Sequence, residues 1–407
     1  MDYKELTSCR FCTSANLKEI LDLGQIPLVN NLLTTQDQEC KKYPLKVLYC
    51  YDCTMMMLSI VVDPTILYSN YCYQSGISKG FVQHCKELEH EISTSLGRNR
   101  SCSVRRPFVI SIAENDGTFL EQFLFNNSAV KVLGIEPAKN LCEIARSKGV
   151  FMVNKFFDAS TALDVAFGHG EADYIVAQNV FAHVDNVYEF MNSAKGLLKE
   201  NGTIIIEVPW AGDTISQGDY GQVYAEHLSY ITVTGMIRFA KQCGLEVVKI
   251  KYFDVLHCGT IRFYLKRNGT VANVSDLWEI NNATYREKCI LENIEGAFRR
   301  MKHTQYIDPT EGVVGVGASA KGTVFLNYLN FNNINLEKSV IYDNTPTKIG
   351  KFQPGTRIPI KDFNLIKDEK REIMILAWNW ETELIKNVRA INPEAKFYVP
   401  FPIPYRM

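Results

Sequence analysis

The feature that most constrains the fold is an alternation of two patterns between about residues 105 and 267. Short apolar runs are separated by stretches whose apolar residues recur at helical spacing. This alternation is typical of α/β domains with a mostly parallel sheet. The expected strands are 108–113, 130–135, 174–178, 203–208, 246–252 and 261–265, and the expected helices include 140–148, 187–198 and 235–242.

The alternation resumes in the last hundred or so residues, with apolar runs at 313–316, 339–342, 373–377 and 397–399. These runs predict a second α/β unit, and the 407-residue length has room for two or three domains. We expect an N-terminal module at 1–60, a connector and helix at 61–100, an α/β domain at 101–268, an amphipathic helical linker at 269–306 and a C-terminal α/β domain at 307–407.

Charge and hydropathy exclude several classes of protein. Lys and Arg total 44 against 45 for Asp and Glu, a balance without the basic excess of a nucleic-acid binder. The 46% apolar content excludes an acidic disordered chain. No apolar run reaches the roughly 18 residues that span a bilayer, and the N-terminus lacks a secretory pattern. We expect a cytoplasmic protein without membrane or nucleic-acid partners. The oligomeric state stays open, and a monomer is compatible with the sequence.

Four of the 12 cysteines form two pairs, Cys9-Arg-Phe-Cys12 and Cys50-Tyr-Asp-Cys53. Cytoplasmic thiols stay mostly reduced, so paired cysteines indicate metal binding or catalysis rather than disulfides. Two such turns supply the four soft ligands of a tetrahedral Zn²⁺ site, and four protein ligands make that site structural. The alternatives are two unrelated turns or a redox dithiol. Zinc is favoured because residues 1–60 otherwise lack a core-forming periodicity.

A candidate cofactor loop follows the first expected strand of the middle domain. Gly117 lies where the strand turns into a helix, and it would allow a ligand close to the backbone. Glu136 ends the second strand, the position from which a carboxylate holds ribose hydroxyls. The glycines are fewer than in a nicotinamide site, which favours S-adenosylmethionine. The alternative is an acidic loop beside a surface glutamate.

Seven motifs, in this order, resemble those of the S-adenosylmethionine-dependent sugar C-methyltransferases, which act on nucleotide-linked 4-keto-6-deoxy sugars. The resemblance covers nearly the whole chain and extends to residues 354–356 and 377–379. The motifs are the four cysteines, LGQIPLVN at 23–30, YCYQSGIS at 71–78, NDGT at 115–118, YAEHLSY at 224–230, HCGTIR at 257–262 and GVGASAKGTVFLN at 315–327.

This resemblance implies a zinc-binding module, a class I methyltransferase domain with a Rossmann-like sheet, and a C-terminal Rossmann-like α/β domain. It implies S-adenosylmethionine as cofactor, structural Zn²⁺, and a TDP- or GDP-linked sugar as substrate. The implied reaction is methylation at C3 beside a C4 ketone, through an enolate. The alternatives are O- or N-methylation of a nucleotide sugar, or a zinc-containing binding protein with impaired catalysis.

The cofactor loop departs from the family pattern at two positions. Ser111 stands where the family has an acidic residue, and Ala113 stands where it has glycine. We expect the alanine to be tolerated with a negative φ, and the missing acid to weaken cofactor binding. The resemblance implies that the cofactor-binding residues are Ala113, Asn115, Gly117, Glu136, Pro137, Gln178 and Asn179.

An enolate requires a base near neutral pKa and donors for the enolate oxygen. His227 is the favoured base because imidazole titrates near pH 7. Glu226 would orient an imidazole or take the proton itself, and Tyr224 has a phenol suited to the enolate oxygen. Without the resemblance, Glu226 and His227 would be an exposed ion pair and His183 a packed or capping residue. With it, His183 lies beside the reacting centre and Tyr73 closes over the site.

The substrate is expected in the cleft between the two α/β domains. Gly317 and Lys321 would hold its diphosphate through backbone approach and a point charge. The alternative for this segment is a tight turn that starts a helix. The full set of expected substrate-binding residues is Tyr71, Ser75, His257, Arg262, Gly317, Lys321 and Asn327.

Overall fold

The computed structural model describes residues 2–68, 71, 73–98, 106–126, 129–254, 259–294, 296, 311–329, 335–401 and 403–407. Among these residues, no helix is long and apolar enough to cross a membrane. The described part contains three larger sheets of four, seven and six strands, and a two-stranded sheet formed by β1 (Tyr3–Glu5) and β5 (Ile60–Val62).

The N-terminal sheet is dominated by a long antiparallel ribbon of β2 (Leu17–Pro27) and β3 (Lys42–Cys50). β4 (Met56–Leu58) pairs with β3, and β11 (Ser229–Tyr230) joins the sheet from the middle of the chain. The expectation that this region lacks a core-forming periodicity is wrong. Along β3, buried residues alternate with half-buried ones, as in a strand that covers a core with one face.

The seven-stranded sheet has the order β12-β13-β10-β9-β6-β7-β8. All neighbours are parallel except those of β13, which lies antiparallel between β10 and β12. The six strands expected from the apolar runs are all present, so the predicted α/β class is confirmed. The strands are β6 (Phe108–Ile112), β7 (Lys131–Ile135), β8 (Met152–Val153), β9 (Ala172–Gln178), β10 (Leu198–Pro209), β12 (Leu245–Phe253) and β13 (Thr260–Arg267).

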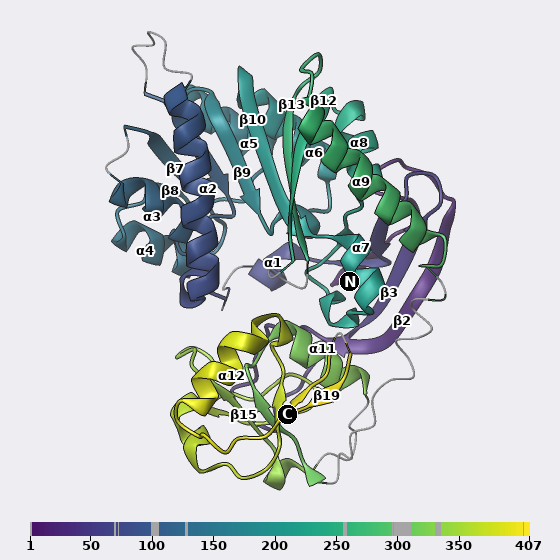
Figure 1. Ribbon diagram of the computed structural model, residues 1–407, viewed down its shortest axis with the longest axis vertical. Coiled ribbons are helices and arrows are strands. Elements are labelled where there is room, and N and C mark those ends of the chain that lie inside the picture. The colour runs from purple at the N-terminus through teal and green to yellow at the C-terminus, as the bar shows by residue number, and fades with distance from the viewer. Residues whose placement is uncertain are drawn as a thin grey trace.

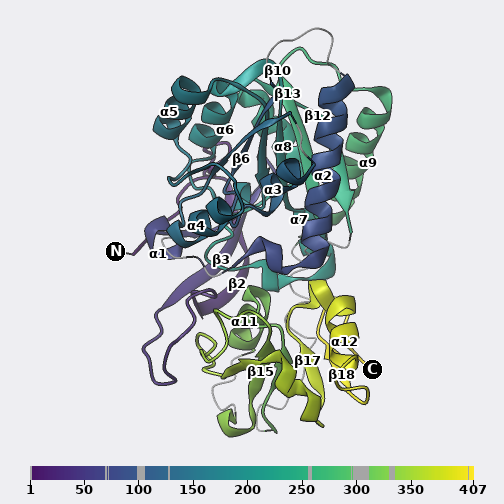
Figure 2. The ribbon, with the colours of Figure 1, turned by 90° about the vertical axis from the view of Figure 1, so that its left-hand side faces the viewer.

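Helices cover both faces of this sheet (Figure 2). α2 (Lys79–Arg98), α3 (Thr118–Phe125) and α4 (Lys139–Ser147) pack on one face, with Val109 and Val176 of the strands. The opposite face uses the alternate strand residues, such as Ile110 and Ile175, because successive side chains of a strand point to opposite faces. The helices on this face are α5 (Ala159–His169), α6 (Val187–Gly196) and α8 (Val233–Gln242).

Two further helices lie next to this sheet. α7 (Ala211–Gln217) follows β10, and α9 (Val274–Leu291) packs against β12, α7 and α8. α9 lies within the expected linker, of which the structure describes 269–294 and 296.

The six-stranded sheet of the C-terminal unit has the order β16-β15-β14-β17-β18-β19. Its first five strands are parallel, and only β19 at the edge is antiparallel. In the chain, helix α11 (Ala320–Tyr328) follows β14, and helix α12 (Glu381–Arg389) connects β17 to β18. The strands are β14 (Val314–Val316), β15 (Val340–Asp343), β16 (Ile360–Asp362), β17 (Ile373–Ile375), β18 (Phe397–Val399) and β19 (Tyr405–Arg406).

The N-terminal ribbon connects the two α/β units, as Figures 1 and 2 both show. At its cysteine end, Phe11 packs edge-on against Phe239 of α8 with ring centroids 5.3 Å apart. At its other end, Leu23 and Tyr43 share a core with Phe325 of the C-terminal unit. The N-terminal region is therefore part of both neighbouring cores.

Candidate active site and metal centre

The four paired cysteines converge at the end of the ribbon. Their sulfur atoms all lie within 4.8 Å of one another, with 3.5 Å between Cys9 and Cys53 and 3.6 Å between Cys12 and Cys50. Four ligands at about 2.3 Å from a central zinc ion lie roughly 3.8 Å apart in a tetrahedron. The donor set and its spacing therefore fit a closed Zn²⁺ site, as the cysteine pattern predicts.

A cavity of about 560 Å³ lies where the N-terminal module, the seven-stranded sheet and the C-terminal unit meet. It opens at the carboxyl ends of the parallel strands, where open α/β sheets bind their ligands. The structure brings fourteen of the residues expected at the site to its wall. They are Tyr71, Tyr73, Ser75, Ala113, Asn115, Glu136, Pro137, Gln178, Asn179, His183, Tyr224, His227, Gly317 and Lys321.

Four other expected residues, Gly117, Glu226, Arg262 and Asn327, are absent from this wall. His257 lies outside the described residues. Asn327 donates from Nδ2 to the carbonyl oxygens of Thr323 and Pro354, so it holds a neighbouring loop in place.

The cofactor loop has an unusual backbone. Ala113, Asn115 and Gly117 have φ values of +53°, +61° and +83°. The expectation that Ala113 keeps a negative φ is therefore wrong, because an L residue here adopts the left-handed conformation that favours glycine. Gly117 serves a different purpose from ligand approach, since a Cβ added there would lie 2.9 Å from the Ala145 Cβ of α4.

Two buried glutamates fix this loop. Glu136 accepts from the backbone N–H of Asn115 at 3.0 Å and of Ala138 at 2.9 Å, and burial raises its pKa. Glu114, which the sequence analysis missed, accepts from the Leu120 N–H at 2.8 Å and bonds the Ser111 side chain. Burial raises the pKa of Glu114 to about 8. Glu114 thus supplies a buried carboxyl group next to Ser111, the position where the family has its acid. The only sequence signal for Glu114 was its place directly before the NDGT motif.

The segment around Tyr73 lies across this loop and is held by it. Asn115 accepts from the Ser75 N–H at 3.0 Å and donates to the Tyr73 carbonyl at 3.2 Å. The Gly76 N–H donates to Asp116 at 3.0 Å. These contacts place Tyr73 and Ser75 on the cofactor side of the cavity.

His227 is bonded through both ring nitrogens. Nδ1 lies 2.9 Å from the backbone carbonyl of Gln222, and Nε2 lies 2.6 Å from the Tyr224 hydroxyl. A carbonyl oxygen only accepts, so Nδ1 carries the proton and Nε2 accepts the phenol proton. Burial raises the pKa of Tyr224 well above its usual value, which keeps the phenol protonated.

His183 stands perpendicular to His227, with ring centroids 5.0 Å apart. Its Nδ1 lies 2.9 Å from the hydroxyl of Tyr68, the last residue of α1 (Pro64–Tyr68). Burial lowers the pKa of His183 to about 4, so the ring is neutral near pH 7. Tyr68 also lines the cavity, and no motif in the sequence indicated it.

Glu226 precedes His227 in the chain and is 1% exposed. Its Oε1 accepts from Asn30 Nδ2 at 3.0 Å, whereas its Oε2 is buried and has no hydrogen-bond partner among the described residues. Burial raises the pKa of Glu226 to about 7. Asn30 lines the cavity from the N-terminal module, and the motif at 23–30 was the only signal for it.

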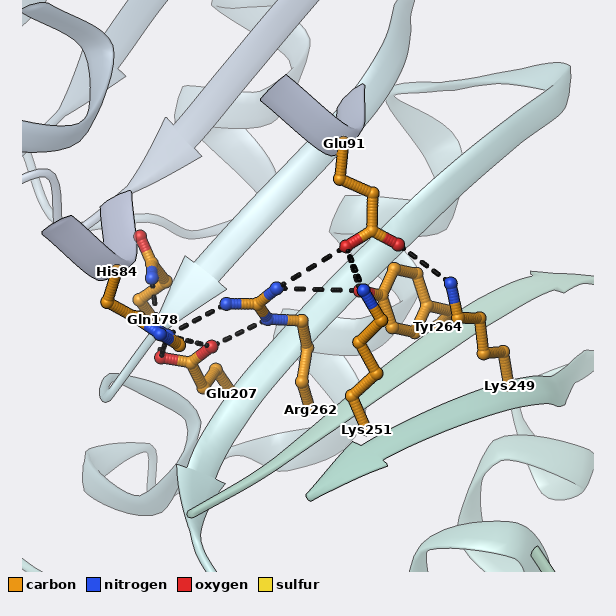
Figure 3. A network of polar contacts seen from close by, with 8 residues as sticks. All are labelled: His84, Glu91, Gln178, Glu207, Lys249, Lys251, Arg262 and Tyr264. Carbon is orange, nitrogen blue, oxygen red and sulfur yellow. Dashed lines mark hydrogen bonds and ion pairs between the residues drawn. The ribbon is translucent and has the colours of Figure 1, made fainter. Parts of the chain in front are cut away.

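Arg262 belongs to a buried polar network behind the cavity (Figure 3). It donates from Nε to Glu207 at 2.6 Å, and Glu207 also contacts His84 of α2 at 2.9 Å. The network reaches the cavity wall through Gln178, whose Nε2 lies 3.3 Å from Glu207. Burial alone would raise the pKa of Glu207, but Arg262 and His84 outweigh it and lower the pKa to about 2. Arg262 is therefore held by a buried carboxylate and does not line the cavity.

Lys321 reaches the cavity from α11 and is buried. Its Nζ lies 3.2 Å from Asp219 of the middle unit, and Asp219 also accepts from Trp378 Nε1 at 3.3 Å. Lys321 therefore ties the two α/β units together at the cavity. Gly317 has φ +85° and packs closely on Ala377. A Cβ added at Gly317 would lie 2.9 Å from the Ala377 Cβ.

Comparisons with known proteins give three family models that match in chain order. The "Putative zinc binding domain" matches residues 9–68, the "Methyltransferase domain" residues 89–250, and the "C-methyltransferase C-terminal domain" residues 292–402. A curated relative, C-methyltransferase NovU of Streptomyces niveus, is 27% identical over 98% of this chain and 97% of its own length.

Solved structures also resemble part of the chain. An S-adenosylmethionine-dependent methyltransferase from Clostridium acetobutylicum has a TM-score of 0.35 at 14% identity, covering 45% of this chain and 92% of its own. Magnesium protoporphyrin IX methyltransferase from Synechocystis has a TM-score of 0.34 at 10% identity, covering 46% of this chain and 81% of its own.

Proposed function

The chain belongs to the zinc-containing, S-adenosylmethionine-dependent C-methyltransferases, and we propose that it methylates C3 of a nucleotide-linked 4-keto-6-deoxy sugar. The observation that carries the proposal is the pairing of His227 with Tyr224 beside a neutral His183, in the cavity that also receives the cofactor loop. Methylation at carbon requires removal of a proton from that carbon. The arrangement offers a proton acceptor, His227, and a hydrogen-bond donor, His183, with ring centroids 5.0 Å apart.

Ala113 and Asn115 of the loop, together with Glu136, are the groups that would hold the cofactor. Their backbone and carboxylate positions suit a ribose and an amino-acid moiety at the carboxyl ends of the strands. The bound cofactor supplies an electrophilic methyl group. Every other step falls to side chains of this protein.

Deprotonation at C3 proceeds through Tyr224. Its oxygen takes the C3 proton while its own proton passes to Nε2 of His227, 2.6 Å away. The C3–H electron pair forms the C3–C4 double bond, and the C4 carbonyl becomes an enolate oxygen. His227 then carries the positive charge, which the Gln222 carbonyl stabilises through Nδ1–H. This assigns the base role to His227, acting through Tyr224.

The enolate oxygen accepts a hydrogen bond from His183. A neutral imidazole is a suitable donor here because it stabilises the negative charge without protonating the oxygen. The residues above leave C3 nucleophilic; a bound cofactor would supply its sulfonium methyl group to C3, the sulfur–methyl electron pair would stay on the departing S-adenosylhomocysteine, and the C4 ketone would reform. The nucleotide lies toward Gly317 and Lys321, which line the cavity from the C-terminal unit, and its diphosphate would share the Lys321 cation with Asp219.

The test is an assay with purified protein, methyl-labelled cofactor and TDP- and GDP-linked 4-keto-6-deoxy sugars. NMR of the product should place the new methyl group on C3. A methyl group on a sugar oxygen or nitrogen would contradict the proposal. Calorimetry with the cofactor is run in parallel, and an absence of S-adenosylmethionine binding would favour a binding protein that has lost catalysis.

A further inference from the structure

Tyr68 is a cavity residue that the mechanism above does not use. We propose that it is a positioning residue whose hydroxyl fixes the tautomer of His183, so that Nε2–H faces the reacting oxygen. This inference rests on the proposed function for its kinetic consequence. The tautomer itself is a property of the protein alone.

The phenol has a single proton and two neighbouring acceptors. Its oxygen lies 2.9 Å from His183 Nδ1 and 3.5 Å from the backbone carbonyl of Glu226. An O–H···O hydrogen bond is normally about 2.5–3.0 Å long, so the Glu226 carbonyl is too distant and the hydroxyl proton points to His183. Burial raises the pKa of Tyr68 well above its usual value, and the phenol therefore keeps this proton.

If Nδ1 accepts from Tyr68, a neutral His183 must carry its own proton on Nε2. His227 has the opposite tautomer, because its Nδ1–H donates to Gln222 and its Nε2 accepts from Tyr224. Two perpendicular imidazoles 5.0 Å apart are thus set as one donor and one acceptor. Without Tyr68, both rings could present a bare Nε2, and the enolate oxygen would lose its donor.

The ring of Tyr68 packs against Tyr71 and His183, with centroid distances of 5.7 and 6.0 Å. Y68F retains this ring and removes only the hydroxyl, so it separates hydrogen bonding from packing. Y51F is the matched control, because Tyr51 is 48% exposed and packs on Tyr49 away from the cavity.

The first readout is the ¹⁵N NMR spectrum of histidine-labelled protein without substrate, with the His183 signals assigned by H183Q. The wild type and Y51F should show His183 protonated on Nε2, and Y68F should shift it toward Nδ1–H. The second readout is turnover. Y68F should lower kcat at least about tenfold, because losing an oxyanion donor costs about 10²–10³. KM for the cofactor should change less than about twofold.

A double-mutant cycle excludes a purely structural effect. Adding Y68F to H183Q should cost no further activity, because Tyr68 acts through His183. An unchanged His183 tautomer in Y68F, or additive losses in the cycle, would overturn the inference. If the sugar panel shows no C3 methylation, the proposed function fails, while the NMR result still decides the role of Tyr68.

Discussion

At the end of the cavity where we propose that proton transfer occurs, uncharged groups hydrogen-bond the titratable side chains. His183 is bonded to Tyr68, His227 to Tyr224 and the Gln222 carbonyl, and Glu226 to Asn30. Burial shifts the pKa values of His183 and Glu226 in opposite directions, and both shifts favour the uncharged form. Near pH 7, His183 is therefore neutral and Glu226 is close to its transition.

This arrangement predicts a pH-dependent stability difference for E226Q. The pKa of Glu226 rises from 4.5 to about 7 on folding, so the folded protein binds this proton more tightly than the unfolded chain. The wild type should lose stability relative to E226Q as the pH rises from 4.5 to about 7, by on the order of 3 kcal/mol in total. Urea unfolding at pH 5 and pH 8 measures the difference.

E39Q is the control for this comparison, because Glu39 is exposed. Its unfolding free energy relative to the wild type should be similar at both pH values. If the gap between E226Q and the wild type were also equal at both pH values, the burial of an ionisable Glu226 would be disproved.

At the scale of elements, the loop between β6 and α3 adopts a left-handed conformation at Ala113. A113G should stabilise the protein by up to about 1 kcal/mol, because glycine adopts this φ without the strain of a Cβ. Cofactor affinity should be retained or improved. Thermal unfolding and calorimetry give both quantities. A166G within α5 is the control, and it should destabilise by roughly 0.5–1 kcal/mol. Destabilisation by A113G comparable to A166G would contradict the strained loop.

The polar network in Figure 3 joins α2 to the seven-stranded sheet, and it predicts how substitutions of Arg262 and Glu207 change the stability of the protein. R262M should destabilise the protein by about 3–5 kcal/mol, because Glu207 would remain buried without its guanidinium partner. The apolar pair R262M/E207L should recover much of this loss. The lowered pKa of Glu207 means that its stabilising contribution is present above about pH 4.5 and is lost as the pH falls toward 2.

Denaturant unfolding of these variants at pH 6 and pH 3 checks both statements. The advantage of the wild type over R262M should shrink at the lower pH. An R262M variant with wild-type stability but a raised KM for the sugar nucleotide would restore the substrate role that the sequence suggested for Arg262.

In the whole molecule, the cysteine cluster and the segment that carries His227 meet at the N-terminal sheet. β11 begins two residues after His227 and pairs with β4 of this sheet, while Arg10 of the first cysteine pair donates to the Leu228 carbonyl. Zinc removal should therefore abolish methyl transfer although the metal takes no part in the chemistry. Hydrogen exchange at β11 and β4 should rise together with the loss of activity, and zinc should restore both.

C50S and C289S form the matched pair for this prediction. Cys50 is a buried member of the cluster, whereas Cys289 is exposed on α9. C50S should lose bound zinc and activity, and C289S should keep both. Full activity in zinc-free protein would contradict the view that the ribbon positions the catalytic segment.

Much of the fold could be predicted from the sequence because its signals are local. Ten strands of the two α/β units coincide with the expected apolar runs, whereas the short strands β8, β16 and β19 were not expected. The spacing of the paired cysteines also predicted that their sulfur atoms meet. The backbone at Ala113 could not be predicted, because φ depends on hydrogen bonds made by Glu114 and Glu136. The long N-terminal ribbon was missed because its core partners lie hundreds of residues away in the chain.

Of the residues expected at the site, the structure brings fourteen to the cavity wall. Residues that matter through a contact with another side chain were not predicted, even where, like Asn30, they belong to a motif. Asn30 and Tyr68 contact Glu226 and His183 only after distant segments meet, at sequence separations of 196 and 115 residues. Arg262 belongs to a motif, yet its side chain contacts the buried Glu207. Membership of a motif could not show whether this side chain points to the cavity or to a buried carboxylate.

The central claim, deprotonation at C3 by His227 through Tyr224, is tested most directly by solvent deuterium exchange. A nucleotide-linked 4-keto-6-deoxy sugar would be incubated with the protein in D₂O with S-adenosylhomocysteine, so that no methyl transfer occurs, and C3 deuteration followed by NMR. We predict deuterium incorporation at C3 with the wild type, reduced at least about 100-fold in H227N and Y224F. An absence of exchange in a wild-type preparation that methylates the same sugar, or undiminished exchange in H227N, would contradict the account.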